Sequence, residues 1–152
     1  MTKKILIAYY SWSNTTKQVA KNLVQALNAD LLELKVKDDV FSPDMYETSA
    51  IAKAQIKTKN FPALLTKLPE ISQYETILVG SPVWSGAPAT PIYSFLKQIT
   101  NFKGKLATFY TDVGSAGDYS KIFKTWAAPL TVEAVYPKEK NILTWAKEVI
   151  QK

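Results

Sequence analysis

Residues 11–16, with the sequence SWSNTT, form the clearest candidate ligand-binding loop in this chain of 152 residues. Five of their six side chains carry a hydroxyl or an amide that can form hydrogen bonds. Residues 4–10 before the loop are mostly apolar or aromatic, and residues 16–27 after it have apolar side chains at helical spacing. A strand that leads into a helix directs hydroxyls and unpaired backbone N–H groups to one point. This arrangement suits the binding of a phosphate.

Ordinary helix capping is the alternative explanation for this loop. Ser13, Asn14, Thr15 or Thr16 could accept a hydrogen bond from an N–H group at the start of the helix and do nothing more. One cap needs only one side chain, whereas four adjacent candidates are present. The sequence leaves both interpretations open, an anion site and a simple cap.

The composition excludes several kinds of chemistry. The chain has no cysteine and no histidine, which rules out thiol nucleophiles, disulfides, Cys/His zinc sites and imidazole acid–base catalysis. We expect no catalytic residue and no metal site. The net charge is +6, from 19 basic and 13 acidic residues. The lysines are scattered and no arginine-rich run is present, so we expect no nucleic-acid binding and interpret the charge as a solvated basic surface, suited to acidic partners.

The length and the start of the sequence predict one domain, residues 1–152, in the cytoplasm. A chain of this size can bury a core without disulfides or metals. The opening sequence MTKKILIAYY has too few apolar residues for a signal peptide or a membrane span. We therefore expect no association with membranes.

Short apolar runs alternate with helical patterns along the chain. Strands are expected at residues 4–10, 30–36, 74–80, 105–110 and 132–136, and helices at residues 16–27, 44–57, 90–99, 119–128 and 138–152. This alternation predicts an α/β fold, a three-layer α/β/α sandwich around a five-stranded parallel sheet of order 2-1-3-4-5. Unusual loops follow the first, third and fourth strands, and all three lie at carboxyl ends, where such sheets bind ligands.

The residues in these loops discriminate among phosphate-binding proteins of this topology. A phosphoacceptor receiver domain needs carboxylates where this chain has Tyr9, Tyr10, Gly80 and Ser81, and a low-molecular-weight tyrosine phosphatase needs a cysteine. A dinucleotide site needs GxGxxG after the first strand, and this loop contains no glycine. A mononucleotide whose phosphate is held by hydroxyls and N–H groups remains.

Three motifs together resemble the flavodoxin family: YYSWSNTTK, ILVGSPVWSGAPATPIYSFL and TDVGSAGD, in this order and spacing over nearly the whole chain. The resemblance is strongest to short flavodoxin-like proteins with a Ser-Trp-Ser first loop, and it implies FMN as cofactor and low-potential one-electron transfer between redox partner proteins. Similar proteins have Gly-Asn-Thr where this chain has Asn14, Thr15 and Thr16. Asparagine tolerates the left-handed conformation that glycine adopts there.

The resemblance assigns cofactor contacts residue by residue. The FMN phosphate would be surrounded by Ser11, Ser13, Asn14, Thr15 and Thr16, with Trp12 over the loop or against the ribityl chain. The second loop, which lines the isoalloxazine ring, is Pro82, Val83, Trp84, Ser85 and Gly86, and the third is Thr111, Asp112, Val113, Gly114, Gly117, Asp118 and Tyr119.

Individual residues in these loops keep alternative interpretations. We expect Trp84 to stack on flavin because it lies among Pro, Ser and Gly at a strand end, and a core tryptophan is the alternative. Tyr119 is either a flavin contact or a surface residue, and the two aspartates could cap a helix. Gly86 is either a plain turn glycine or the site of a peptide that turns over when flavin is reduced, as in similar proteins. Trp126 and Trp145 lie on apolar helix faces, which predicts core positions.

The main functional alternative is an FMN-dependent NAD(P)H:quinone-type oxidoreductase. Such enzymes have a related fold but usually need longer loops or a dimer to enclose a substrate. A third possibility is a ligand-binding module without redox function. Flavodoxins are commonly acidic, whereas this chain is basic, so its partner need not be the usual reductase. We expect a monomer.

Overall fold

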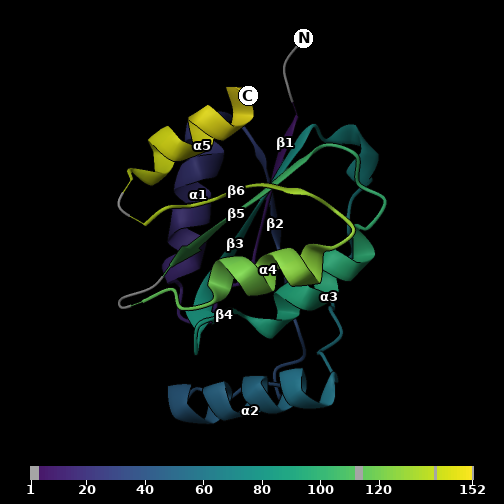
Figure 1. Ribbon diagram of the computed structural model, residues 1–152, viewed down its shortest axis with the longest axis vertical. Coiled ribbons are helices and arrows are strands. Elements are labelled where there is room, and N and C mark those ends of the chain that lie inside the picture. Colours follow the sequence, from purple (N-terminus) through teal and green to yellow (C-terminus); the bar gives the residue numbers. More distant parts are fainter. Residues whose placement is uncertain (1–3, 112–114, 139, 152) are drawn as a thin grey trace.

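The computed structural model describes residues 4–111, 115–138 and 140–151, and it is an α/β sandwich (Figure 1). The strands are β1 (Ile5–Tyr9), β2 (Asp30–Glu33), β3 (Thr76–Trp84), β4 (Ala87–Pro88), β5 (Lys105–Thr111) and β6 (Val132–Val135). The helices are α1 (Thr15–Leu27), α2 (Met45–Thr58), α3 (Thr90–Gln98), α4 (Tyr119–Ala127) and α5 (Ile142–Gln151), with a 3₁₀ turn, η1 (Ile71–Gln73).

The sheet has the predicted topology. Five parallel strands follow the order β2-β1-β3-β5-β6, which is the expected 2-1-3-4-5 once the short strand β4 is set aside. Strand β4 pairs antiparallel with the end of β3 and was not expected. The order reverses between β1 and β3, so the loops that follow these two strands leave toward opposite faces of the sheet.

Helices cover both faces of the sheet, and each face has its own core. All five residues of β1 are buried, as expected for a central parallel strand. Helices α1 and α5 pack on one face, around residues such as Leu23 and Trp145. Helices α3 and α4 pack on the other, around residues such as Phe95 and Trp126, and α2 lies beside α3. The prediction that Trp126 and Trp145 are core residues is confirmed.

Two strands, β2 and β3, end three or more residues away from the predicted position. Strand β2 ends at Glu33, because the chain beyond it bonds to the irregular segment that follows α2. The N–H of Leu65 donates to the carbonyl of Lys35 at 2.7 Å, and the hydroxyl of Thr66 donates to the carbonyl of Glu33 at 2.8 Å. This contact covers part of an otherwise open sheet edge. Strand β3 extends to Trp84, because its last residues pair with β5 and β4.

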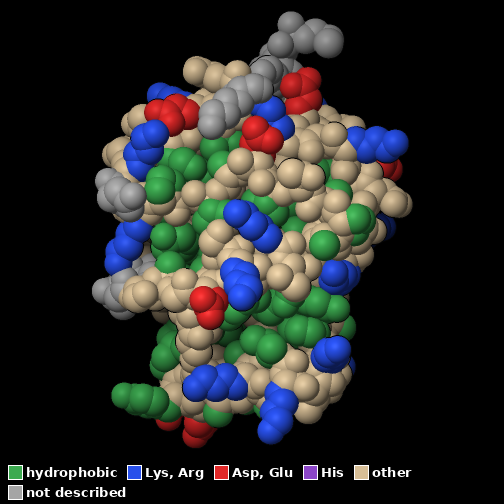
Figure 2. Space-filling view, in the orientation of Figure 1, with side chains coloured by type: hydrophobic (Ala, Val, Ile, Leu, Met, Phe, Trp, Pro, Cys, Tyr) green, Lys and Arg blue, Asp and Glu red, His purple; other side chains and the backbone are tan. Residues whose placement is uncertain are grey.

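The surface charges agree with a dispersed basic character. Figure 2 shows lysine side chains spread over this face of the molecule, with no continuous basic block. Among the described residues, no helix is long and apolar enough to cross a lipid bilayer.

Candidate functional site

Direct contacts join the three polar loops at the carboxyl edge of the sheet. The Thr16 hydroxyl, at the start of α1, lies 2.8 Å from the Thr111 hydroxyl at the end of β5. The backbones of Gly86 and Gly117 also touch, since a Cβ atom on Gly117 would lie 2.8 Å from the Cα of Gly86. Segments far apart in the sequence therefore form one continuous surface, as the strand order predicted.

The helix cap is not one of the four residues considered from the sequence, since within the described chain no backbone N–H donates to the side chains of Ser13, Asn14, Thr15 or Thr16. The Ser11 hydroxyl accepts hydrogen bonds from the N–H groups of Asn14 at 3.0 Å and Lys17 at 3.3 Å, so Ser11 acts as the helix cap. Within the described chain, the N–H groups of Thr15 and Thr16 have no acceptor. The side chains of Ser13, Asn14 and Thr15 are exposed around them. These free donors and side chains at a helix N-terminus can receive an anion.

Asn14 stands where similar proteins have glycine, and its backbone adopts a conformation that glycine favours. Asn14 has φ = 77° and ψ = −12°, which is the left-handed conformation. Glycine adopts this conformation without strain, and asparagine is among the residues that tolerate it best. Asn14 therefore adopts the left-handed conformation that was expected at this position.

Thr16 is buried, unlike the three residues before it. Its side chain is 2% exposed, and its hydroxyl faces Thr111 rather than the open loop. Trp12 also turns away from the loop centre, since its indole N–H donates to the carbonyl of Ser42 at 3.0 Å. The contact with Ser42, in the segment that precedes α2, was not expected for Trp12, which the resemblance places over the loop or against the ribityl chain.

The second loop is a tight hairpin between β3 and β4. Trp84 pairs with Ala87, which leaves Ser85 and Gly86 as the two turn residues. Their φ angles are 53° and 79°, and two successive positive φ values are characteristic of a type I′ turn. The hydroxyls of Ser85 and Ser49 lie 2.7 Å apart and tie the turn to α2. Ser49 was missed by the sequence analysis, because no local pattern relates residues 36 positions apart.

The expectation that Trp84 stands ready to stack on flavin is corrected by the structure, which places the indole in the core. The side chain is 3% exposed and packs edge-on against Tyr10 and Phe41, with ring centroids 5.6 and 4.9 Å away. The polar residues and glycine next to Trp84 in the sequence form the turn, whereas the indole ring packs in the core beneath the turn. A tryptophan at the end of a strand can close the core under a loop.

Tyr119 is likewise a core residue, neither exposed nor placed on the open surface. Its side chain is fully buried, and its hydroxyl lies 2.7 Å from that of Thr108. The Thr108 hydroxyl donates to the carbonyl of Val79 at 2.8 Å, so Tyr119 serves as the donor to Thr108. Burial raises the pKa of Tyr119 well above its ordinary value, which keeps this hydroxyl protonated. The pair fastens the start of α4 to β5 and β3.

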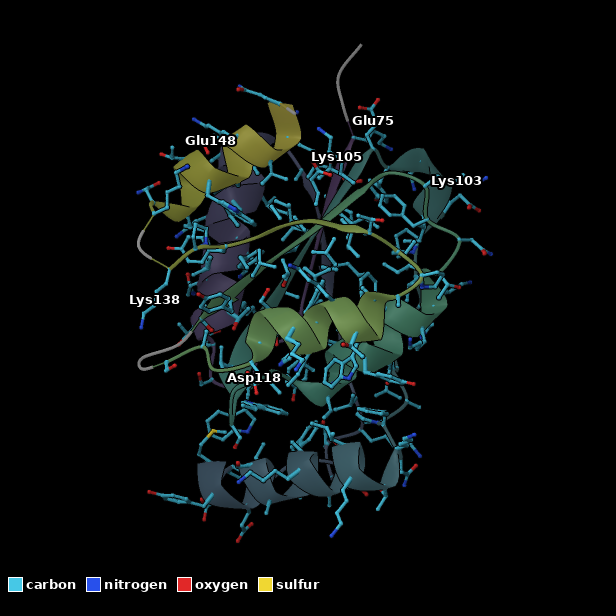
Figure 3. The ribbon with its side chains drawn as sticks, viewed as in Figure 1. Glu75, Lys103, Lys105, Asp118, Lys138 and Glu148 are labelled. Carbon is cyan, nitrogen blue, oxygen red and sulfur yellow. The ribbon has the colours of Figure 1, made fainter. Side chains whose placement is uncertain are left out.

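The third loop is described only in part. Asp112, Val113 and Gly114 lie outside the described residues. Asp118 occupies the N-cap position of α4, but its exposed carboxylate makes no capping hydrogen bond. Figure 3 shows Asp118 at the start of α4, at the opposite end of the sheet from Glu75 and Lys105.

Replacing Gly117 with alanine should destabilise this junction. The new methyl group would lie 2.8 Å from the Cα of Gly86, and the φ of 57° disfavours any side chain. We expect a loss of about 1–3 kcal/mol in the free energy of unfolding, measured by urea denaturation. Asp118→Ala is the matched control, with an expected change within about 0.5 kcal/mol. Equal stabilities of the Gly117 variant and the wild type would show that the two loops can separate at no cost.

Two cavities lie at opposite ends of the sheet. The larger, of about 950 Å³, is bordered by Glu75, Phe102 and Lys105 at the amino ends of β3 and β5. A smaller cleft of about 490 Å³ borders Ser11 and Trp12 at the carboxyl end. Ligands of such sheets bind at the carboxyl ends of the strands, so size alone does not make the larger cavity the functional site.

Comparisons with known proteins find a flavodoxin family model and several flavoprotein structures that are similar to this chain. The flavodoxin family model matches residues 4–134. A flavoprotein from Lactobacillus acidophilus NCFM, crystallised in complex with FMN, is 40% identical with a TM-score of 0.88, over 95% of this chain and 99% of its own. The apo-form of the flavoprotein from that organism, solved by NMR, is 42% identical with a TM-score of 0.73, over 91% and 95%. A flavodoxin from the domain Archaea, 15% identical with a TM-score of 0.58 over 96% and 92%, shares the fold. No curated protein matches the chain significantly.

Proposed function

The chain belongs to the flavodoxin family, and from this premise we propose that it binds FMN at the three joined loops and carries electrons singly between redox proteins. The observation that carries the proposal is the 40% identity, over 95% of the chain, to a flavoprotein crystallised with FMN. The cofactor supplies the redox chemistry, and the protein supplies binding, orientation and exclusion of side reactions.

The first loop suits the phosphate of FMN. The free N–H groups of Thr15 and Thr16 stand at the positive end of the α1 dipole, and the side chains of Ser13 and Thr15 lie exposed beside them. The cradle is made of dipoles and hydroxyls, because no lysine lies within residues 11–16. Neutral donors of this kind recognise a phosphate by direction and number of hydrogen bonds.

The second and third loops suit a flat ring. The tight turn at Ser85 and Gly86 and the neighbouring Gly117 present backbone with little side-chain bulk. Main-chain groups can therefore approach the isoalloxazine edge, with Pro82 and Val83 beside the turn. Gly86 could also reverse its peptide on reduction of the flavin, since glycine tolerates either orientation. Trp84 supports this surface from beneath.

An electron carrier suits these loops better than a turnover enzyme does. They are short and leave little chain to enclose a second substrate beside the flavin. An FMN-dependent oxidoreductase acting on quinones would need a second binding surface for its substrate. We further propose a cytoplasmic monomer whose redox partners present acidic faces to its basic surface.

Anaerobic reduction tests the proposal. Stepwise addition of dithionite to the FMN-loaded protein should reduce the flavin in two resolved one-electron steps, followed by visible absorbance. The protein alone should show no rapid NADH- or NADPH-dependent reduction of quinones. A single two-electron step together with rapid quinone reduction would instead establish the oxidoreductase.

A further inference from the structure

A separate cleft lies on the β2 side of the first loop. It has a volume of about 490 Å³ and is bounded by the end of β1, the end of β2 and the segment that precedes α2. The second and third loops do not border it. The volume lies within the range typical of small-molecule sites, and the cleft is at the carboxyl end of the sheet.

Aromatic side chains form one part of this cleft. Tyr10, Trp12 and Phe41 border it, and the centroids of the Tyr10 and Phe41 rings are 6.1 Å apart. The hydrogen bond from the Trp12 indole to the Ser42 carbonyl fixes the indole on this side of the loop. A flat heterocyclic base can stack on such rings.

A carboxylate stands at the end of β2 in the same cleft. Glu33 is the last residue of β2, and its side chain keeps 35% of its surface exposed beside Lys35, with 3.7 Å between the charged atoms. An exposed carboxylate accepts hydrogen bonds from hydroxyl groups, such as those of a ribose.

Charged side chains of both signs border the remaining side of the cleft. Lys35, Lys37 and Asp38 contribute to its lining, and all three are exposed. The ammonium groups of the two lysines can reach a phosphate that extends toward solvent, as lysines do in many nucleotide sites.

We propose that this cleft binds a purine nucleotide. The base stacks on the Trp12 and Phe41 side, the ribose hydroxyls bond to Glu33, and the phosphate meets Lys35 and Lys37. The ligand is either a free nucleotide or the adenosine phosphate part of a dinucleotide coenzyme, which share this chemistry. The site adjoins the proposed FMN site, because Ser11 and Trp12 belong to both, but the free N–H groups of Thr15 and Thr16 that are proposed for FMN lie outside its lining.

The test is a titration of the FMN-loaded protein with AMP, followed by chemical-shift changes in ¹H–¹⁵N NMR spectra. We expect saturation with a Kd below about 1 mM, with the FMN absorbance unchanged. Glu33→Gln should weaken AMP binding about tenfold, as expected for one hydrogen bond to a charged group. Dideoxy-AMP, which lacks both ribose hydroxyls, should bind the wild type about tenfold more weakly than AMP and should lose nothing further in the variant.

A matched control is available on α5. Glu148 also pairs with a lysine, Lys140, at 2.6 Å, and Figure 3 shows it on α5, which contributes no residue to the lining of the cleft. Glu148→Gln should leave AMP affinity within about twofold of the wild type. An equal effect of the two glutamine substitutions would overturn the role of Glu33.

The remaining arms identify the ligand source and separate this inference from the proposed function. Binding of NAD⁺ at least tenfold tighter than AMP would indicate a dinucleotide coenzyme, and equal affinities would indicate a free nucleotide. No saturation by AMP at about 10 mM would overturn the proposal, as would AMP binding that FMN abolishes, because AMP would then occupy the first loop. Failure to load FMN would contradict the proposed function alone, since the same AMP titration can be read on the apoprotein.

Discussion

Replacing Trp84 with alanine is expected to lower the free energy of unfolding of the apoprotein by about 3–5 kcal/mol. The indole is 3% exposed and closes the core between Tyr10 and Phe41, so its removal leaves a cavity beneath the second loop. The loss combines the transfer free energy of a large aromatic side chain with the cost of the empty space. Urea denaturation measures the change directly.

The variant Trp84→Phe separates the effect of core packing on stability from the effect of any contact between Trp84 and flavin on fluorescence. Trp84→Phe keeps an aromatic ring in the core and should cost less than the alanine variant, about 1–2 kcal/mol. Because the indole lies in the core, the fluorescence of bound flavin should be the same in this variant as in the wild type. A Trp84→Ala protein of nearly wild-type stability with restored flavin emission would instead place the indole against the ring.

The order of the strands could be predicted because it depends on local patterns. Buried parallel strands appear as short apolar runs, such as ILIAY in β1, and the helices between them have apolar residues at helical spacing. The position of the ligand-binding edge follows from that order alone. The left-handed conformation of Asn14 was also predictable, because few residues tolerate it.

The direction of individual aromatic side chains could not be predicted. Trp84 lies in a stretch of Pro, Ser and Gly that is typical of an exposed loop, and one of its packing partners, Phe41, comes from an aperiodic segment 43 positions earlier. Tyr119 opens a helix next to a polar loop, yet its hydroxyl is bonded to Thr108 inside the core. The sequence shows that a loop is rich in candidates, whereas tertiary packing decides which of them remain exposed.

In the first loop, too, the sequence could not predict which hydroxyl side chains remain exposed. Hydroxyl side chains at four of its six positions appear equivalent in the sequence. In the structure Ser11 caps the helix and Thr16 bonds to Thr111, while Ser13 and Thr15 remain exposed. The difference follows from tertiary contacts, such as the one between Thr16 and Thr111, 95 positions apart, which no local pattern reveals.

We expect the apoprotein to bind FMN at least about 100-fold more tightly than riboflavin, which lacks the phosphate. Two free N–H groups, of Thr15 and Thr16, and the hydroxyl of Ser13 are placed to bond to it. Each hydrogen bond to a charged group contributes about 1.5–3 kcal/mol, so two or three of them give roughly 3–6 kcal/mol, a factor of about 10² to 10⁴. Quenching of flavin fluorescence during titration gives both dissociation constants.

Two serine variants test how this affinity is divided within the loop. Ser13→Ala should weaken FMN binding by about 1–2 kcal/mol and leave the stability of the apoprotein unchanged. The Ser13 hydroxyl is exposed, and its hydrogen bond within the described residues, with the Thr15 hydroxyl, is 3.5 Å long. Ser11→Ala should instead lower apoprotein stability by about 1 kcal/mol, since it removes the acceptor for two N–H groups. Ser72→Ala, at the opposite end of the sheet, is the control for both. Equal affinity for riboflavin and FMN, with no effect of Ser13→Ala, would reduce the loop to a helix cap.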